Sequence, residues 1–190
     1  MELEQITVRR AVRVGYQILL RIQINLLLPT NATAIRDFYQ TMADGCLRWA
    51  EEDYGAQLKA AYQALEDPRE KAQQRMQKYH FQMRQCYEAD TYIAFLCEGM
   101  LTGRWNGAGE GYWRASYVWN KSEQTLLPPS QILALFSDRL SIKRLPFRPD
   151  GVYPDGEELI FFRNVTHSTP FEERKIPLEK LQGNQASSQK

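Results

Sequence analysis

The first part of the chain alternates apolar and polar residues with a period of two. Between Ile6 and Leu28 the apolar side chains fall almost entirely at even positions, while the odd positions carry mainly Arg, Gln and Asn. This alternation predicts β-structure with one buried face and one solvated face. The run is long for a single strand and contains Gly15. We therefore expect either one strand bent at that glycine or two strands.

Three arginines, Arg9, Arg13 and Arg21, lie on the polar face of this segment. They are suited to binding an anion. They are equally suited to remaining solvated and protecting a sheet edge from aggregation, which is the interpretation we favour.

After Pro29 the apolar residues recur at steps of three and four, which predicts a helix that packs on a sheet. Thr30 or Asn31 can cap its start, and Pro68 ends the run. The apolar stripe slips at Gly55, so we expect a kink there or two successive helices. The stripe consists of Ile35, Phe38, Tyr39, Met42, Cys46, Trp49, Leu58, Ala61, Tyr62 and Leu65.

The middle of the chain contains three runs rich in Tyr, Phe, Ile, Val and Trp, at residues 79–87, 92–97 and 113–119. Turn residues separate these runs, and together they predict a β-meander. The second run is apolar at both even and odd positions, so we expect it to lie inside the sheet. A short helix from Pro128 to Phe136, a strand at Leu159–Phe162 and an edge segment at Ile176–Leu178 complete the chain.

We therefore predict an α+β fold, with a mainly antiparallel, twisted sheet and one long helix, straight or kinked, on one face. We expect residues 1–182 to form a single domain and residues 183–190 to be a disordered polar tail. A cone-shaped sheet of the nuclear-transport-factor-like type is the alternative architecture, although such proteins usually begin with helices.

The composition favours an ordinary globular protein, with 43% hydrophobic and 25% charged residues and a formal net charge of +1. This balance argues against a nucleic-acid or membrane-surface partner, because both require a strong positive field. The apolar run at residues 18–28 is broken by polar side chains, so we predict neither a signal peptide nor a membrane span, and a cytoplasmic location.

The three cysteines, Cys46, Cys86 and Cys97, lie within apolar patterns, and we predict that they are free thiols. The chain has no CxxC motif, and its two histidines are far apart in sequence. We therefore predict no metal site and no cofactor.

Aromatic and basic side chains gather in and after the glycine-rich segment Gly103–Gly111, and these predict a binding surface for a protein or a small molecule. Trp and Arg are favoured anchors in interfaces, and glycines on either side of Trp105 leave its side chain free to project. The candidate binding residues are Arg104, Trp105, Tyr112 and Arg114. We expect Trp113, Tyr117 and Trp119 to belong to the core instead.

Catalysis is the alternative. Carboxylates near the turns of the meander, among them Glu88, Glu98 and Glu110, suit a small hydrolase or isomerase if two of them converge in a sheet cleft. We expect a non-catalytic domain, because carboxylates are common beside turns, and we assign no catalytic residue. The glycine-rich segment joins two predicted strands and not a strand to a helix, so we do not expect it to bind a nucleotide.

The order of these elements resembles the C-terminal domain of bacterial anti-sigma-V lysozyme-receptor proteins, a domain otherwise catalogued as of unknown function. The residues that carry the resemblance are 90–93, 103–111, 118–120, 125–127, 133–136, 159–162 and 176–181. The resemblance implies an α+β fold and a non-catalytic binding role. Family members often have Gly-Gly-Ala-His in the loop, where this chain has Gly107-Ala108-Gly109-Glu110 and no histidine. Members are usually extracytoplasmic, so the resemblance and the predicted location differ.

Overall fold

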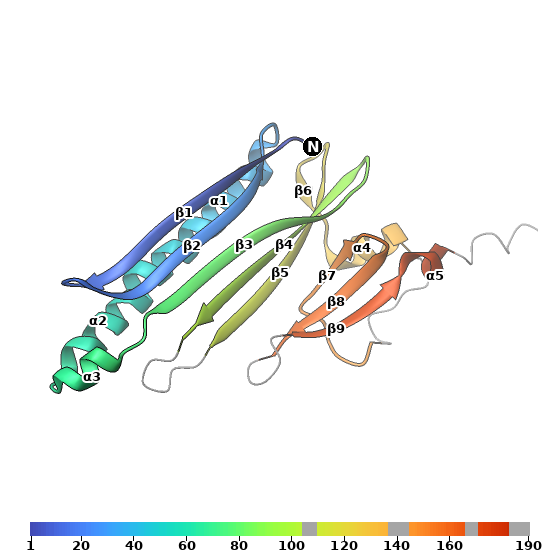
Figure 1. Ribbon diagram of the computed structural model, residues 1–190. Helices are drawn as coiled ribbons and strands as arrows, with labels where there is room; N and C mark the ends of the chain where they lie inside the picture. The colour runs from blue at the N-terminus through green and yellow to red at the C-terminus, as the bar shows by residue number, and fades with distance from the viewer. Residues whose placement is uncertain (104–109, 137–144, 166–170, 183–190) are drawn as a thin grey trace, which may run out of the picture. The chain divides into compact units, whose positions relative to one another are not determined.

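The computed structural model describes residues 1–103, 110–136, 145–165 and 171–182 (Figure 1). The predicted tail, residues 183–190, lies outside this part of the chain. The described residues form an α+β fold with two sheets, as the sequence predicted in class. The elements are β1 (Leu3–Val14), β2 (Gln17–Pro29), α1 (Thr33–Arg48), a π-helical turn (Trp49–Tyr54), α2 (Gly55–Ala64), α3 (Pro68–Gln73), β3 (Gln77–Glu88), β4 (Tyr92–Thr102), β5 (Gly111–Asn120), β6 (Thr125–Leu126), α4 (Pro129–Phe136), β7 (Gly151–Asp155), β8 (Glu158–Asn164), β9 (Phe171–Pro177) and α5 (Leu178–Gln182).

The larger sheet has six strands in the order β1-β2-β3-β4-β5-β6, and the smaller has three in the order β7-β8-β9. Strands β1 and β2 form an antiparallel hairpin, so the first apolar run is two strands that turn at Gly15. Strands β2 and β3 pair in parallel, with Ile22 opposite Tyr79 and Ile24 opposite Phe81. The helices between β2 and β3 make this parallel pairing possible, because such a crossover needs a long connection.

The chain divides into two compact units. Unit 1 contains residues 1–83 and 98–112, and unit 2 contains residues 84–97 and 113–190. The prediction of a single domain is not tested by this division and stays a prediction.

In unit 1 the helices pack against the apolar face of the hairpin. The even-numbered residues of β2 from Leu20 to Leu28 are buried, as the alternation predicted, and Ile35, Tyr39 and Leu58 of the helices are buried as well. Figure 1 shows α1 running along β1 and β2. The predicted slip in the helical stripe is real. The π-helical turn absorbs it, and α2 begins at Gly55.

Gly55 allows the helix to approach β1 closely. A Cβ atom at this position would lie 2.9 Å from a methyl group of buried Val12. Contacts this short essentially never occur for a real Cβ, so glycine is required where α2 crosses the strand.

The opposite face of the unit 1 sheet is polar. Asn25 of β2 accepts a hydrogen bond from Thr7 of β1 at 3.1 Å and lies 2.7 Å from His80 Nε2 of β3. Gln82 donates to Glu98 of β4 at 3.1 Å. These contacts join polar side chains of neighbouring strands. The side chains lie on the face of the sheet that the alternation predicted to point away from the helix.

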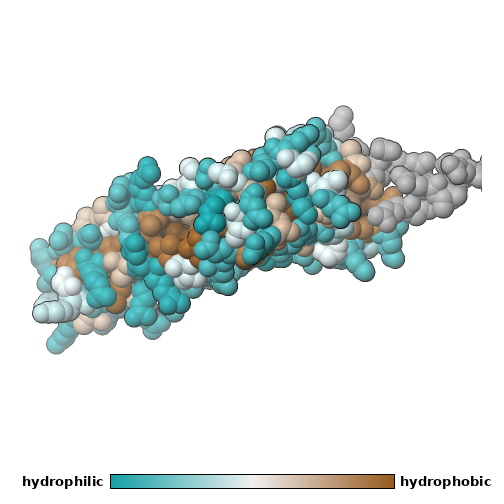
Figure 2. Space-filling model, turned by 90° about the horizontal axis from the view of Figure 1, so that it is seen from above, coloured by the Kyte–Doolittle hydropathy of each residue, from teal (hydrophilic) through white to brown (hydrophobic). Residues whose placement is uncertain are grey.

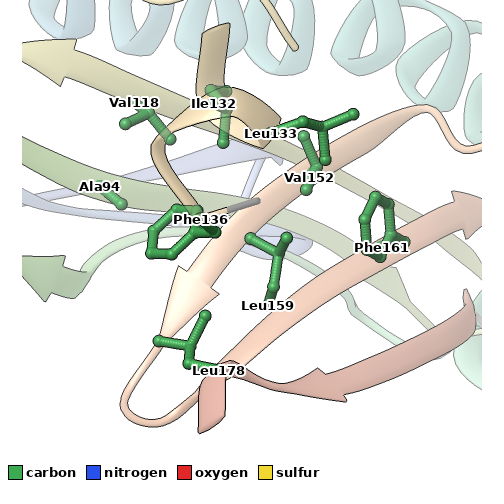
Figure 3. Packing of buried hydrophobic residues seen from close by; sticks show 9 residues of the cluster. All are labelled: Ala94, Val118, Ile132, Leu133, Phe136, Val152, Leu159, Phe161 and Leu178. Carbon is green, nitrogen blue, oxygen red and sulfur yellow. The ribbon is translucent and has the colours of Figure 1, made fainter. Parts of the chain in front are cut away.

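Unit 2 builds its core from the smaller sheet, α4 and parts of β4 and β5. Figure 3 shows the main cluster, in which side chains of α4 point towards residues of β7 and β8. Its buried members are Ala94, Val118, Ile132, Leu133, Phe136, Val152, Leu159, Phe161 and Leu178. The residues of β4 from Ile93 to Cys97 are fully buried, which confirms that this strand lies inside the sheet.

Candidate binding surface

An aromatic cluster in unit 1 combines stacking with exposure. The Trp49 and Tyr54 rings lie 5.3 Å apart and are within 14° of parallel, and the Tyr79 ring meets Trp49 at 5.3 Å edge-on. Trp49 is 40% exposed although it lies among apolar helix positions. We call these three residues the aromatic shelf. A half-exposed tryptophan that is held by its neighbours presents a fixed apolar surface to a ligand.

The π-helical turn explains why Trp49 and Tyr54 meet. In a regular α-helix, residues five apart point in different directions, because one turn takes about 3.6 residues. The π-helical turn between them bonds each residue to the one five positions away, which brings such a pair to the same side. π-Helical turns within α-helices are frequent at functional sites. The expectation that Trp49 belongs to the core is wrong, because 40% of its surface is exposed and the buried residue of this turn is Ala50.

A buried amide holds the shelf to the sheet. Gln77 of β3 is fully buried. It accepts a hydrogen bond from the Tyr54 hydroxyl at 2.5 Å and donates one to the Gly103 carbonyl at 3.2 Å. Burial raises the pKa of Tyr54, and the bond to Gln77 opposes this rise. The hydroxyl therefore stays protonated and acts as a donor at neutral pH.

Gly103 is the first residue of the predicted binding segment, and it packs directly against Gln77. Its φ angle is +102°, and a Cβ atom there would lie 3.2 Å from the Gln77 Cα. Both the left-handed backbone and the close approach require glycine at this position. The Gln77 side chain therefore connects the start of the predicted segment to the shelf, through one hydrogen bond to the Gly103 carbonyl and one from the Tyr54 hydroxyl.

The residues after Trp49 carry negative charge. Glu51, Glu52 and Asp53 follow it after Ala50, and the latter two are exposed. The Glu51 carboxylate lies 4.0 Å from the Arg10 guanidinium, which offsets its charge. The exposed acids nearest to Trp49 in sequence are Glu52 and Asp53. The shelf thus combines an aromatic surface with acidic residues. The sequence prediction did not identify this pairing, because it placed the slip of the helical period at Gly55 and kept Trp49 within the apolar stripe.

Two of the sequence-predicted binding residues, Arg104 and Trp105, lie outside the described residues. Tyr112 is the second residue of β5 and lies in unit 1, and its hydroxyl donates to the exposed Glu110 carboxylate at 3.2 Å. Desolvation raises the pKa of Tyr112, and the hydrogen bond to Glu110 adds to this rise.

Arg114 lies in unit 2 and already has partners there. Its guanidinium forms an ion pair with Glu173 of β9 and lies 3.8 Å from the centre of the Phe171 ring. Its side chain is only 11% exposed. The Asn164 side chain accepts from the Arg114 N–H at 2.8 Å and donates to its carbonyl at 3.1 Å, which joins β8 to β5. These contacts make Arg114 a structural connection between the two sheets within unit 2.

The carboxylates considered for catalysis have neutral or cationic partners. Glu98 accepts from the Gln82 amide, Glu110 from the Tyr112 hydroxyl, and Glu88 from the Lys121 ammonium at 2.7 Å. Lys121 lowers the pKa of Glu88 to about 2. A general acid needs the opposite shift, so this arrangement does not favour the hydrolase or isomerase alternative.

Over the part of the chain that the structure describes, no three His, Cys, Asp or Glu side chains are arranged to hold a metal ion, and no helix is long and apolar enough to cross a bilayer. Figure 2 shows one face of the molecule, on which hydrophilic residues predominate and smaller hydrophobic areas lie between them. All three cysteines are free thiols, as predicted. Burial raises the pKa of Cys46, so its sulfur is a weak nucleophile.

No protein-family model matches the chain, and no curated protein is similar to it in sequence. Several solved structures share its fold, among them two from the same domain family. A member of the DUF3298 family from Bacteroides fragilis superposes with a TM-score of 0.60 at 14% identity, covering 94% of this chain and 91% of that one. A DUF3298 family protein from Pseudomonas aeruginosa superposes with a TM-score of 0.55 at 14% identity, covering 96% and 93%.

These structural neighbours are bacterial proteins of a domain family of unknown function. The likeness extends over nearly the whole chain, so it agrees with the part of the sequence resemblance that concerned such a domain. At this identity it shows the fold alone, and the relation to anti-sigma-V proteins stays a prediction.

Proposed function

We propose that the chain is a non-catalytic binding domain, and that it binds a segment of another protein at the aromatic shelf and the adjoining segment Gly103–Gly111. The observation that carries the proposal is the exposure of Trp49 while its ring is stacked on Tyr54. Trp and Tyr dominate the energetics of protein interfaces, and a pre-positioned ring loses little conformational freedom on binding.

The charge next to the shelf indicates what the partner segment contains. Glu52 and Asp53 are exposed and follow the shelf tryptophan closely. Acidic side chains around an aromatic anchor favour a partner with Lys or Arg beside an apolar or aromatic residue. In this proposal Arg104 and Trp105 contribute from the adjoining segment, and Tyr112 ends it. Arg114 contributes only by holding the sheets of unit 2, because its guanidinium is paired with Glu173.

A displayed library of random peptides, selected against the immobilised chain, tests the proposal. We expect enriched peptides to contain an aromatic residue with neighbouring Lys or Arg. Fluorescence polarisation should then show that Trp49→Ala weakens binding of an enriched peptide by about tenfold or more, the effect of losing roughly 2 kcal/mol at a hot spot. Trp105→Ala should also weaken binding and leave the melting temperature nearly unchanged.

The matched control is Tyr16→Ala. Tyr16 is a fully exposed aromatic residue at the β1–β2 turn, away from the shelf in sequence. Its loss should leave peptide affinity unchanged. Selection that enriches no peptide, or peptides that bind Trp49→Ala and wild type equally well, would contradict the proposal.

A further inference from the structure

Strand β1 is an edge of the six-stranded sheet, and no strand lies beyond it among the described residues. The Thr30 N–H donates to the Glu2 carbonyl at 3.1 Å. Residues that exchange hydrogen bonds alternate along an antiparallel pair, so the N–H and C=O groups of the even-numbered residues of β1 face β2. This holds as far as Val12, after which the register shifts. The odd-numbered groups from Leu3 to Ala11 therefore point away from the sheet. Such a row of outward N–H and C=O groups is able to pair with another strand.

The charges along β1 are divided between its two halves. Glu2 and Glu4 lie at its beginning, and Arg9, Arg10 and Arg13 lie in its second half. A parallel copy of the strand would place these arginines side by side. An antiparallel copy places acid against base. We propose that β1 pairs antiparallel with β1 of a second copy of the chain, about a two-fold axis at Thr7.

The hydrogen-bond pattern and the side chains select this register together. An axis at Thr7 pairs odd residues with odd residues, as the outward backbone groups require. It places Glu4 opposite Arg10 of the second copy and Ile6 opposite Val8 of the second copy. The neighbouring registers that keep the same backbone pairing shift the strands by two residues. Each of them places Glu4 opposite a valine.

Ion pairs within each copy extend this match. The Arg36 guanidinium of α1 lies 3.0 Å from the Glu4 carboxylate, and Arg10 lies 4.0 Å from Glu51. Pairing the strands at Thr7 places four side chains of alternating charge in a row. The row begins with Arg36 and Glu4 of one copy and continues with Arg10 and Glu51 of the second copy. The two-fold axis repeats the row. The side chains of Glu4 and Arg10 are 51% and 57% exposed, so both are accessible to a second copy.

This self-complementarity favours a second copy over an unrelated strand as the occupant. A two-fold interface uses the same patch twice, so one favourable pair counts two times. The charges also make this arrangement specific. The parallel orientation would place like charges side by side, and the neighbouring antiparallel registers would place Glu4 opposite a valine. The inference rests on β1 alone and does not depend on the proposed peptide-binding surface.

Sedimentation equilibrium of the full chain from micromolar to millimolar concentration tests the pairing. We expect a monomer–dimer equilibrium for the wild type. Glu4→Arg and Arg10→Glu should each weaken the dimer by about tenfold or more, because each places like charges opposite each other twice. Combining the two substitutions restores opposite charges and should restore the dimer. The matched control Glu2→Arg makes the same change opposite Val12 of the second copy, and its effect should be much smaller.

Thr7→Pro tests the backbone pairing separately. The Thr7 N–H points outward, so proline there removes a backbone donor from the proposed interface and no backbone hydrogen bond from the β1–β2 hairpin, where it removes only the bond from the Thr7 hydroxyl to Asn25. We expect a monomer with unchanged circular dichroism. A wild-type chain that stays monomeric throughout the concentration range would overturn the proposal. So would a dimer that tolerates Thr7→Pro, or a charge-swapped double variant that associates no better than the single variants.

Discussion

Unit 1 buries its apolar surface with long, regular elements, whereas unit 2 does so with short ones. In unit 1 one alternating strand pair meets one helical stripe, and leucine and isoleucine fill most of the space between them. In unit 2 the buried cluster combines residues of four short elements, α4, β7, β8 and α5, with parts of the two longer strands β4 and β5. Long amphipathic elements make a core that depends on many equivalent contacts. Short elements cannot do so, and their core depends more on particular residues.

The two units also treat a buried polar side chain differently. Unit 1 buries Gln77 and satisfies it with neutral hydrogen bonds to Tyr54 and Gly103. Unit 2 covers Arg114 with the Phe171 ring and pairs its charge with Glu173. A neutral amide costs less to bury than a charge does, so unit 2 depends more strongly on keeping both members of its pair.

The largest expected effect separates buried and exposed aromatic residues within unit 1. Tyr39 is fully buried on α1, and Tyr39→Ala should reduce the free energy of unfolding by about 3–5 kcal/mol, which is typical for emptying a core aromatic site. Trp49→Ala should cost only about 1 kcal/mol, because much of that ring is already in water. Urea unfolding monitored by circular dichroism measures both. Equal costs would mean that the shelf is part of the core.

Gly151→Ala tests the dependence of unit 2 on particular residues. A Cβ atom at Gly151 would lie 2.5 Å from the Phe162 ring and 2.7 Å from the Ser116 hydroxyl, so we expect a loss of about 3 kcal/mol from overpacking. Gly45→Ala in α1 is the control. Nothing lies within 4 Å of its Cβ position, and alanine should stabilise the helix by up to about 1 kcal/mol. Similar melting temperatures for the two variants would contradict this contrast.

Arg114→Met should destabilise unit 2 by about 2 kcal/mol. Methionine keeps much of the contact with Phe171 but leaves the Glu173 carboxylate without its cation. The cost should fall short of that of a fully buried pair, because 31% of the Glu173 side chain is exposed. Arg114→Met combined with Glu173→Leu should recover part of the loss. Denaturant titration of the single and double variants measures the coupling, and purely additive effects would contradict the pair.

The smallest expected effect is a pH dependence in unit 2. Lys121 lowers the pKa of Glu88 from 4.5 to about 2, so the folded state binds this proton less tightly than the unfolded state does. The stabilisation is therefore complete above the unfolded pKa and is lost as the pH falls towards about 2. Lys121→Met should lower the melting temperature by a few degrees at neutral pH. That difference from the wild type should shrink in acid, and a constant difference would show that the ion pair is not its cause.

The sequence predicted unit 1 more completely than unit 2. The switch from a period of two to steps of three and four defined the hairpin and the helices, and the slip at Gly55 marked the π-helical turn. The parallel pairing of β2 with β3 was not predicted, because periodicity shows which face of a strand is buried and not which strand lies next to it. The strand at Leu159–Phe162 was predicted, but its hairpin with β7 was not, and β9 begins earlier than the predicted edge segment at Ile176–Leu178.

The candidate site was only partly predictable. The glycine-rich segment and Tyr112 were found from composition and spacing. Arg114 was included because Arg among aromatic residues near the glycine-rich segment is a favoured binding anchor, and its partner Glu173 lies far along the chain. Trp49 was assigned to the core for the opposite reason. Its position in an apolar stripe predicts burial, whereas the residue buried at this turn of the helix is the neighbouring Ala50.

The parallel pairing of β2 and β3 has a consequence for the order of folding. The β1–β2 hairpin needs only local contacts, whereas β2 can pair with β3 only after all the intervening helical residues have closed the loop between them. We therefore expect the hairpin to form early and the parallel pair late. In stopped-flow experiments Gly15→Ala at the hairpin turn should mainly slow folding, and Phe81→Leu on β3 should mainly accelerate unfolding. Until the parallel pair forms, β2 has an unpaired edge rich in leucine and isoleucine, and that interval is when the chain is most prone to aggregate.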